Sequence, residues 1–277
     1  MHASHFGAVG NLQMAHHRSH DPADKRGGKK PALILLHGFT GSKLDFHDQL
    51  EWFDDLRQTF AYDQRGHGET TNALPYNLNQ LVTDLIGWMN RQDLDQVDLL
   101  GHSMGGMVAL RAVLAHPERF RSLILMDTAP SGIDLMAPAI RDRLNSLVMA
   151  DGCQALVKMM RSQPASRPAQ RGIDFLGEDE HWRRIQVKLT QMDPQAFVDL
   201  GRQLAEQVSV ADRLSAINCP TTILVGEHDA PFVGPSREMA GAIENANLVV
   251  IPKAGHSPQY ENPEVWREAL RAHLIRG

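Results

Sequence analysis

Short apolar runs alternate along the chain with segments whose apolar residues recur at helical spacing. Six runs are short enough to be buried strands, and they occupy residues 31–38, 59–68, 96–103, 122–129, 221–229 and 247–257. Helical patterns lie at 78–89, 104–115, 237–243 and 263–275. Apolar strands separated by helices are typical of a parallel sheet covered on two sides. We therefore predict an α/β fold with a mostly parallel central sheet flanked by helices.

The stretch from residue 131 to residue 206 interrupts this alternation, because it contains no strand-like run. Four helices are expected there, at 136–149, 152–162, 178–191 and 194–206, with a polar connection at 162–172. Helices inserted between two strands of such a sheet often cover a site as a lid. We predict a core domain of residues 1–130 and 207–277 and a helical cap of residues 131–206. A further helical layer of the core is the alternative.

Composition excludes several classes of partner. The 277 residues carry a net charge of -5 with both signs spread along the chain, which disfavours a nucleic-acid-binding tail. No apolar run is long enough to span a bilayer, and no basic region followed by an apolar stretch opens the chain. We expect a cytoplasmic protein that acts on a small molecule and contacts neither nucleic acid nor membrane. Both a monomer and a homodimer remain compatible with the sequence.

The sequence shows no cofactor or metal motif. Neither a dinucleotide nor a phosphate-loop glycine pattern occurs, and Cys153 and Cys219 form no CxxC pair. Histidine is concentrated in the first twenty residues, at His2, His5, His16, His17 and His20. These histidines lack a spacing that closes around one ion. We expect no cofactor and no metal, and we interpret the histidines as surface side chains on a meander of short strands.

The segment GHSMG, residues 101–105, places Ser103 between Gly101 and Gly105, after an apolar run and before a helical pattern. A plain glycine-rich turn is one interpretation. The other is a strained strand–turn–helix that exposes a nucleophilic serine, where the glycines remove clashes. The position between strand and helix favours the second.

A serine nucleophile needs a histidine base and a carboxylate that orients the base. His256 follows the sixth apolar run, and Asp229 follows the fifth. Asp127, at the end of the fourth run, is a rival for the carboxylate. We favour Asp229, so that the predicted catalytic residues are Ser103, Asp229 and His256.

The chain resembles the α/β-hydrolase superfamily from about residue 30 to its C-terminus. The matching pieces are LLHGFTGS (35–42), YDQRGHGET (62–70), GHSMGG (101–106), AHPERFRSLILMD (115–127), VGEHD (225–229) and GHSP (255–258). The resemblance implies the α/β-hydrolase fold and the chain order serine, acid, histidine. It also implies an oxyanion hole made by the backbone N–H groups of Phe39 and Met104. His37, Gly38 and His102 would support the turns around that site.

Three chemistries fit such residues. Hydrolysis of a carboxylic ester through an acyl-enzyme is the first, and Met136, Met149, Met159, Met160 and Met192 would then supply apolar pocket walls or helix core. The second is carbon–carbon hydrolysis or lyase chemistry, because HGFTGSK, RGHGET and SMGG resemble the hydrolase-fold lyase of menaquinone synthesis. Its polycarboxylate substrates would require arginines, for which Arg65, Arg161, Arg167 and Arg171 are candidates. The third is a small-molecule sensor with slow hydrolysis.

Overall fold

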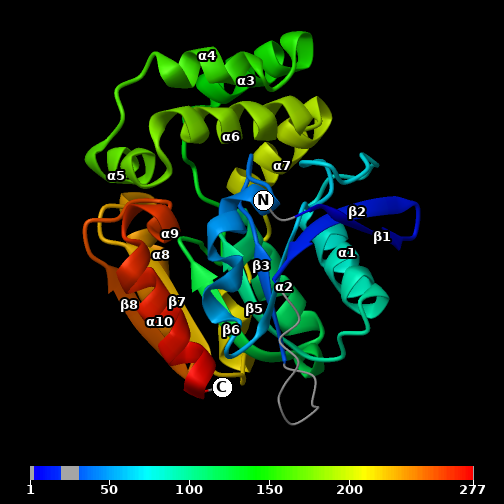
Figure 1. Cartoon of the computed structure of the whole chain (residues 1–277), viewed down its shortest axis with the longest axis vertical. Helices are drawn as coiled ribbons and strands as arrows, with labels where there is room; N and C mark the ends of the chain where they lie inside the picture. The colour runs from blue at the N-terminus through cyan, green and yellow to red at the C-terminus, as the bar shows by residue number, and fades with distance from the viewer. Residues whose placement is uncertain (1–2, 20–30, 277) are drawn as a thin grey trace.

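A single eight-stranded sheet forms the centre of the computed structural model, which describes residues 3–19 and 31–276 (Figure 1). Its strands are β1 (His5–Val9), β2 (Leu12–Arg18), β3 (Ala32–Leu36), β4 (Gln58–Tyr62), β5 (Val97–His102), β6 (Phe120–Met126), β7 (Thr221–Gly226) and β8 (Ala246–Ile251). They lie in the order β1-β2-β4-β3-β5-β6-β7-β8. Strands β3 to β8 pair in parallel, while β1 and β2 are antiparallel. The predicted mostly parallel α/β sheet is confirmed.

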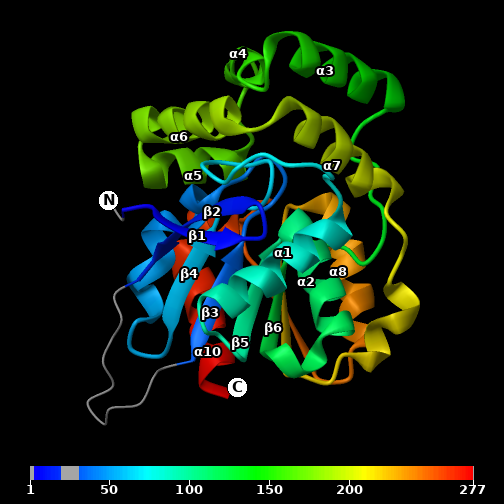
Figure 2. The ribbon, with the colours of Figure 1, turned by 90° about the vertical axis from the view of Figure 1, so that its right-hand side faces the viewer.

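Helices cover both faces of the sheet (Figure 2). Helices α1 (Leu78–Arg91), α2 (Met104–Ala115) and α8 (Ala230–Ala242) pack on one face. The 3₁₀ segment η1 (Lys43–Phe53) and helix α10 (Pro263–Arg276) pack on the other. Side chains alternate along a strand, so Ile34 of β3 joins the first apolar core and Leu35 joins the second. The sheet is therefore buried on both faces, as its continuous apolar strands require.

Short segments complete the core. They are η2 (Pro117–Arg119), η3 (Ala211–Ala216) and α9 (Pro258–Glu261). Helix α8 begins at Ala230, seven residues before the helix predicted at 237–243, and it contains Pro235. The proline conceals the first half of this helix in the sequence pattern, because proline usually marks a helix end.

Five helices lie between β6 and β7 and gather at one end of the sheet (Figure 1). They are α3 (Pro138–Asp151), α4 (Ala155–Arg161), α5 (Arg167–Leu176), α6 (Glu178–Gln191) and α7 (Pro194–Glu206), and we call them the helical insertion. The prediction of a polar connection at 162–172 was wrong, because α5 begins there. The Ser166 side chain caps this helix by accepting from the Ala169 N–H at 3.3 Å, and Gly177 ends it at a φ of 81°.

The N-terminal histidines do not all lie on the surface. His5 is in the antiparallel pair β1–β2, whereas His2 and His20 fall outside the described residues. His16 and His17 in β2 are buried, so the surface interpretation was wrong for both. The His16 ring packs edge-on against Trp88 of α1 at 5.4 Å, and burial lowers the pKa of His16 to about 4.

Across the part of the chain that the structure describes, every helix is too short or too polar to cross a bilayer.

Candidate active site

The loops that follow five parallel strands converge on one edge of the sheet. Parallel strands carry their carboxyl ends to the same edge, which is where sites form in open α/β sheets. The residues that directly follow β3, β5, β6, β7 and β8 therefore come together, and these loops contain His37, Ser103, Asp127, Asp229 and His256. The predicted site residues are brought to one place by topology alone.

Ser103 occupies the turn between β5 and α2 with a φ of 53° and a ψ of -118°. Its N–H donates to the Met126 carbonyl at 2.9 Å, and its own carbonyl accepts from the Thr128 hydroxyl at 2.7 Å. A Cβ on Gly105 would lie 2.6 Å from the Leu36 carbonyl oxygen, so only glycine lets α2 approach β3 this closely. Gly101 is equally constrained against the backbone of Gly105. The glycines around Ser103 are thus required by a strained, tightly packed turn.

His256 lies in the loop between β8 and α9, and its imidazole is held on three sides. Its Nδ1 is 2.7 Å from Oδ2 of Asp229, which precedes α8. The Phe232 ring stacks on it at 4.9 Å, and the His102 ring lies at 4.9 Å on a tilted plane. Asp229 is buried, while the His256 side chain is 41% exposed. An imidazole that is fixed through Nδ1 keeps Nε2 available to a reacting group.

His102 supports the His256 loop. Its Nε2 lies 2.7 Å from the His256 carbonyl oxygen, so Nε2 carries the proton and donates. Burial, followed by the neighbouring His256, lowers the pKa of His102 to about 3. His102 therefore stays neutral across the ordinary pH range and fixes the loop.

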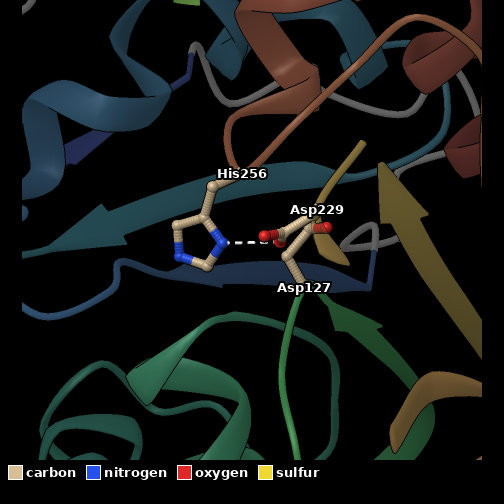
Figure 3. Close-up of side chains that lie close together, drawn as sticks. All are labelled: Asp127, Asp229 and His256. Atoms are coloured by element: carbon tan, nitrogen blue, oxygen red, sulfur yellow. Dashed lines mark hydrogen bonds and ion pairs between the residues drawn. The ribbon is translucent and has the colours of Figure 1, made fainter. Parts of the chain in front are cut away.

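Asp127, the rival acid, contacts Asp229 rather than replacing it. Its Oδ1 accepts from the Gly226 N–H at 2.8 Å. Within residues 3–19 and 31–276, Asp127, Asp229 and His256 are the one group of three metal-ligating side chains whose atoms converge, all within 4.8 Å of one another (Figure 3). The Asp229–His256 hydrogen bond already uses two of these groups. We therefore interpret the cluster as a hydrogen-bonded one, and the absence of a metal stays a prediction.

The segment after β3 lies against Ser103. A Cβ on Gly38 would be 3.0 Å from the Ser103 Cβ, and the Gly41 N–H donates to the Gly38 carbonyl at 3.1 Å. His37 fixes this turn, because its Nε2 accepts from the Gln64 N–H at 3.0 Å and its Nδ1 donates to the Gly38 carbonyl at 2.8 Å. Burial lowers the pKa of His37 to about 4, so this arrangement persists at neutral pH.

The two residues predicted to form the oxyanion hole lie next to Ser103, Met104 in the chain and Phe39 in the wall of the same cavity. Met104 begins α2, and an N–H in the first turn of a helix has no acceptor within that helix. Phe39 lies in the turn between Gly38 and Gly41 and lines the same cavity as Ser103. The helix N-terminus favours negative charge at this point.

A cavity of about 340 Å³ opens in front of Ser103 and His256, between the sheet edge and the helical insertion. Its walls combine backbone of the 38–41 turn with side chains of the insertion. The insertion contributes Met160, Ala169, Gly172, Leu176, His181, Arg184, Ile185 and Lys188. Apolar and cationic side chains from α4, α5 and α6 therefore face the site.

Both the lysine and the arginine of this wall are ion-paired with the core. Lys188 Nζ lies 2.6 Å from an Asp45 carboxylate oxygen. Arg184 binds Asp48 through two nitrogens at 2.5 and 3.0 Å, and Glu180 at 2.7 Å. Neither residue was predicted from the sequence. Their i, i+4 spacing, which places two cations on one face of a helix, was the available signal.

The arginines expected from sequence lie elsewhere. Arg65 is buried against Asp84 at 2.7 Å and donates to the Ala73 carbonyl, and Arg161 stacks on Trp182 at 5.0 Å. Arg167 and Arg171 belong to α5 but are not among the residues that line the cavity.

The five methionines expected to form pocket walls or helix core lie in different environments. Met160 lines the cavity in front of Ser103, whereas Met192 is buried among the insertion helices. Met149 and Met159 are exposed. Met136 lines a second, apolar cavity of about 80 Å³ between α3 and α7. Phe39 lines both cavities and forms a wall between them.

Comparison with known proteins identifies the family of the chain. The sequence profile of the alpha/beta hydrolase family matches residues 33–269. The chain belongs to the α/β-hydrolase family. A candidate 2-succinyl-6-hydroxy-2,4-cyclohexadiene-1-carboxylate synthase of Bacillus subtilis (strain 168) is 30% identical to this hydrolase over 91% of the chain and 93% of the relative.

Two further similar proteins are named as enzymes that act on esters or lactones. The 3-oxoadipate enol-lactonase 2 of Acinetobacter baylyi (strain ATCC 33305 / BD413 / ADP1) is 25% identical over 89% of this chain and 90% of its own. A thermophilic esterase of Thermogutta terrifontis has a solved structure that is 25% identical to this chain. It superimposes with a TM-score of 0.80 over 100% of this chain and 98% of its own. The predicted α/β-hydrolase fold is confirmed.

Proposed function

We propose that this protein is a serine hydrolase that cleaves a carboxylic ester of a small molecule through an acyl-enzyme. One observation carries the proposal: Ser103 stands on a strained turn in the same cavity as His256, whose Nδ1 is bonded to buried Asp229 at 2.7 Å. Strained backbone of this kind clusters at functional sites. The lactonase and esterase relatives support the same class of reaction.

In the proposed reaction, Nε2 of His256 takes the proton of the Ser103 hydroxyl as the oxygen attacks the ester carbonyl. The negative charge that develops on the carbonyl oxygen is stabilised by the N–H groups of Phe39 and Met104. His256 then returns the proton to the leaving alcohol, and an activated water releases the acid. Asp229 keeps the imidazole in the required tautomer.

We further propose that the helical insertion, residues 131–206, is a lid domain over this site. Side chains of α4, α5 and α6 line the cavity, so substrate must pass them. Lys188 and Arg184 are paired with Asp45 and Asp48, so the acidic partners neutralise the positive charge of the cavity wall formed by α6. This favours a substrate whose part beside α6 is neutral, because a carboxylate there would have to displace Asp45 or Asp48.

Lyase or carbon–carbon hydrolase chemistry is the second candidate. It is favoured by the name of the Bacillus subtilis relative and by the presence of Lys188 and Arg184 in the cavity wall. Released from their acidic partners, these two side chains would bind a carboxylate-bearing substrate.

The test combines labelling and turnover. A fluorophosphonate probe should modify Ser103 and leave Ser257, a second serine of the cavity, unmodified when peptides are mapped by mass spectrometry. Wild type should hydrolyse p-nitrophenyl acetate and butyrate with multiple turnovers, and Ser103→Ala should lose at least about 10³-fold in kcat. If the probe labels Ser103 but neither ester is hydrolysed, the lyase or carbon–carbon hydrolase function replaces the esterase function. A single burst of p-nitrophenol without further turnover would indicate a sensor. No labelling in a folded protein would refute a nucleophilic Ser103.

A further inference from the structure

Asp127 is a buried acid beside the proposed catalytic residues that the reaction described above does not use. It follows β6, and Asp229 follows β7, so the two carboxyl groups project from neighbouring strand ends. Figure 3 shows the Asp127 carboxyl beside that of Asp229, with His256 bonded to Asp229. The three groups lie within 4.8 Å of one another.

Asp127 has an unfavourable backbone conformation. Its φ is 46°, in the left-handed region that a residue with a side chain rarely adopts. The Asp127 N–H donates to the Leu224 carbonyl at 3.0 Å, and Oδ1 accepts from the Gly226 N–H at 2.8 Å. A strained residue persists only where its surroundings over-determine it. Asp127 thereby links the end of β6 to the turn that presents Asp229.

The second oxygen of Asp127 faces an acidic neighbour. Oδ2 is buried and meets no N–H or O–H donor. The charged groups that act on Asp127 are the carboxyl groups of Asp229 and Glu261, and a ring nitrogen of His256 lies within 4.8 Å. Two buried carboxyl groups with oxygens within 4.8 Å of each other repel when both are ionised, so one of the two is driven to keep its proton. Burial, followed by the charge of Asp229, raises the pKa of Asp127 well above its usual range.

Asp229 is the member of the pair that carries the charge, because it accepts the His256 hydrogen bond at 2.7 Å. We propose that Asp127 is a positioning residue whose carboxyl group keeps its proton and donates it in a hydrogen bond from Oδ2 to the Asp229 carboxylate. Asp229 is then fixed from two sides, by His256 and by Asp127. The pair bears one negative charge, and that charge is directed at the imidazole.

The protonation state is tested directly by infrared spectroscopy in D₂O, without any substrate. The difference spectrum between wild type and Asp127→Asn at pH 7 should contain the carbonyl stretch of a protonated carboxyl group, which is well separated from carboxylate bands. A difference spectrum that contains a carboxylate band instead would overturn the proposal. This result does not depend on which reaction the enzyme catalyses.

Kinetics test the positioning role and rest on the proposed function. With p-nitrophenyl acetate, Asp127→Asn should keep kcat/KM within about threefold, because its amide accepts from Gly226 and donates to Asp229 as the carboxyl does. Asp229→Asn should lose about 10³-fold or more. Asp127→Leu should lose about tenfold or more in kcat with KM changed less than about twofold, since a misplaced base slows the chemical step.

The acid limb of the pH profile separates positioning from a merely structural role. Loss of the Asp127 donor leaves the full Asp229 charge on His256, so the acid limb of kcat/KM in Asp127→Leu should move up by about half a unit or more. A structural defect would lower kcat equally at every pH. Equal losses in Asp127→Asn and Asp229→Asn, or wild-type kcat in Asp127→Leu, would overturn the proposal. If Asp127→Leu does not fold, Asp127→Asn and the infrared spectrum still decide it, and a wild type without esterase activity would contradict only the proposed function.

Discussion

Ser103 combines a reactive position with an unfavourable backbone. A residue with a Cβ at a φ of 53° costs of order 1–3 kcal/mol, and the hydrogen bonds to Met126 and Thr128 hold it there. The neighbouring glycines relieve clashes with β3 but do not relieve Ser103 itself. The structure therefore stores strain at the residue whose hydroxyl faces the cavity.

This strain predicts a difference between two inactive variants. Ser103→Gly should raise the free energy of unfolding by about 1 kcal/mol relative to Ser103→Ala, because glycine accepts the left-handed backbone and alanine does not. Both variants lack the hydroxyl and should lose ester hydrolysis equally. Urea unfolding of the two proteins measures the difference. An alanine variant that is as stable as the glycine variant would show that the turn is not strained.

At the scale of elements, α6 is joined to the core by its ion pairs. Lys188 reaches Asp45 and Arg184 reaches Asp48, both in η1, and the Tyr260 hydroxyl donates to the Leu44 carbonyl beside them. The Arg184 side chain is only 8% exposed, so water screens this pair weakly. The helical insertion is thus held over the cavity by charge as well as by apolar packing.

Adjacent arginines of α6 provide a matched test of this connection. Arg184→Gln should lower the free energy of unfolding by about 1–3 kcal/mol and should accelerate hydrogen exchange of residues 178–191, since Asp48 and Glu180 lose a shared partner. Arg183→Gln removes an exposed pair with the same Glu180 and should change stability by less than about 0.5 kcal/mol. Equal exchange rates in the two variants would show that Arg184 does not hold the helix.

The elements differ in how far sequence could predict them. Ser103, Asp229 and His256 each follow an apolar run, and parallel pairing brings such positions together whatever lies between them. Helix α5 was missed because its apolar positions are few, although Ser166 and Gly177 are ordinary start and stop residues.

Contacts between side chains that are far apart in the sequence could not be predicted from the local pattern. Asp45 and Lys188 are 143 positions apart, and nothing local to either residue specifies the other. The same holds for Asp127, which looked like an alternative to Asp229. Only the strand order β6-β7 shows that both carboxyl groups occupy the same site.

At the scale of the whole molecule, burial of histidine links folding to pH. Burial is the main cause that lowers the pKa of six histidines. The pKa is about 4 for His16, His37 and His273 and about 3 for His67 and His102, and it is also lowered for His181. In the unfolded chain each titrates near pH 6.5, so between pH 6.5 and pH 4 the unfolded state binds more protons. Buried carboxyl groups with raised pKa values act in the opposite direction, and these are Asp63, Asp127 and Glu261.

Stability should therefore be greatest above pH 6.5 and should fall as the pH drops toward 4. The histidines outweigh the three carboxyl groups by at least about one proton on average between pH 6.5 and pH 5, which corresponds to about 2 kcal/mol or more of stability lost. Urea unfolding across this range measures the loss. His67→Gln, at a fully buried site, should reduce the number of protons taken up on unfolding by up to about one in this pH range. A flat profile in wild type, or a wild-type pH dependence in His67→Gln, would contradict the buried-histidine explanation.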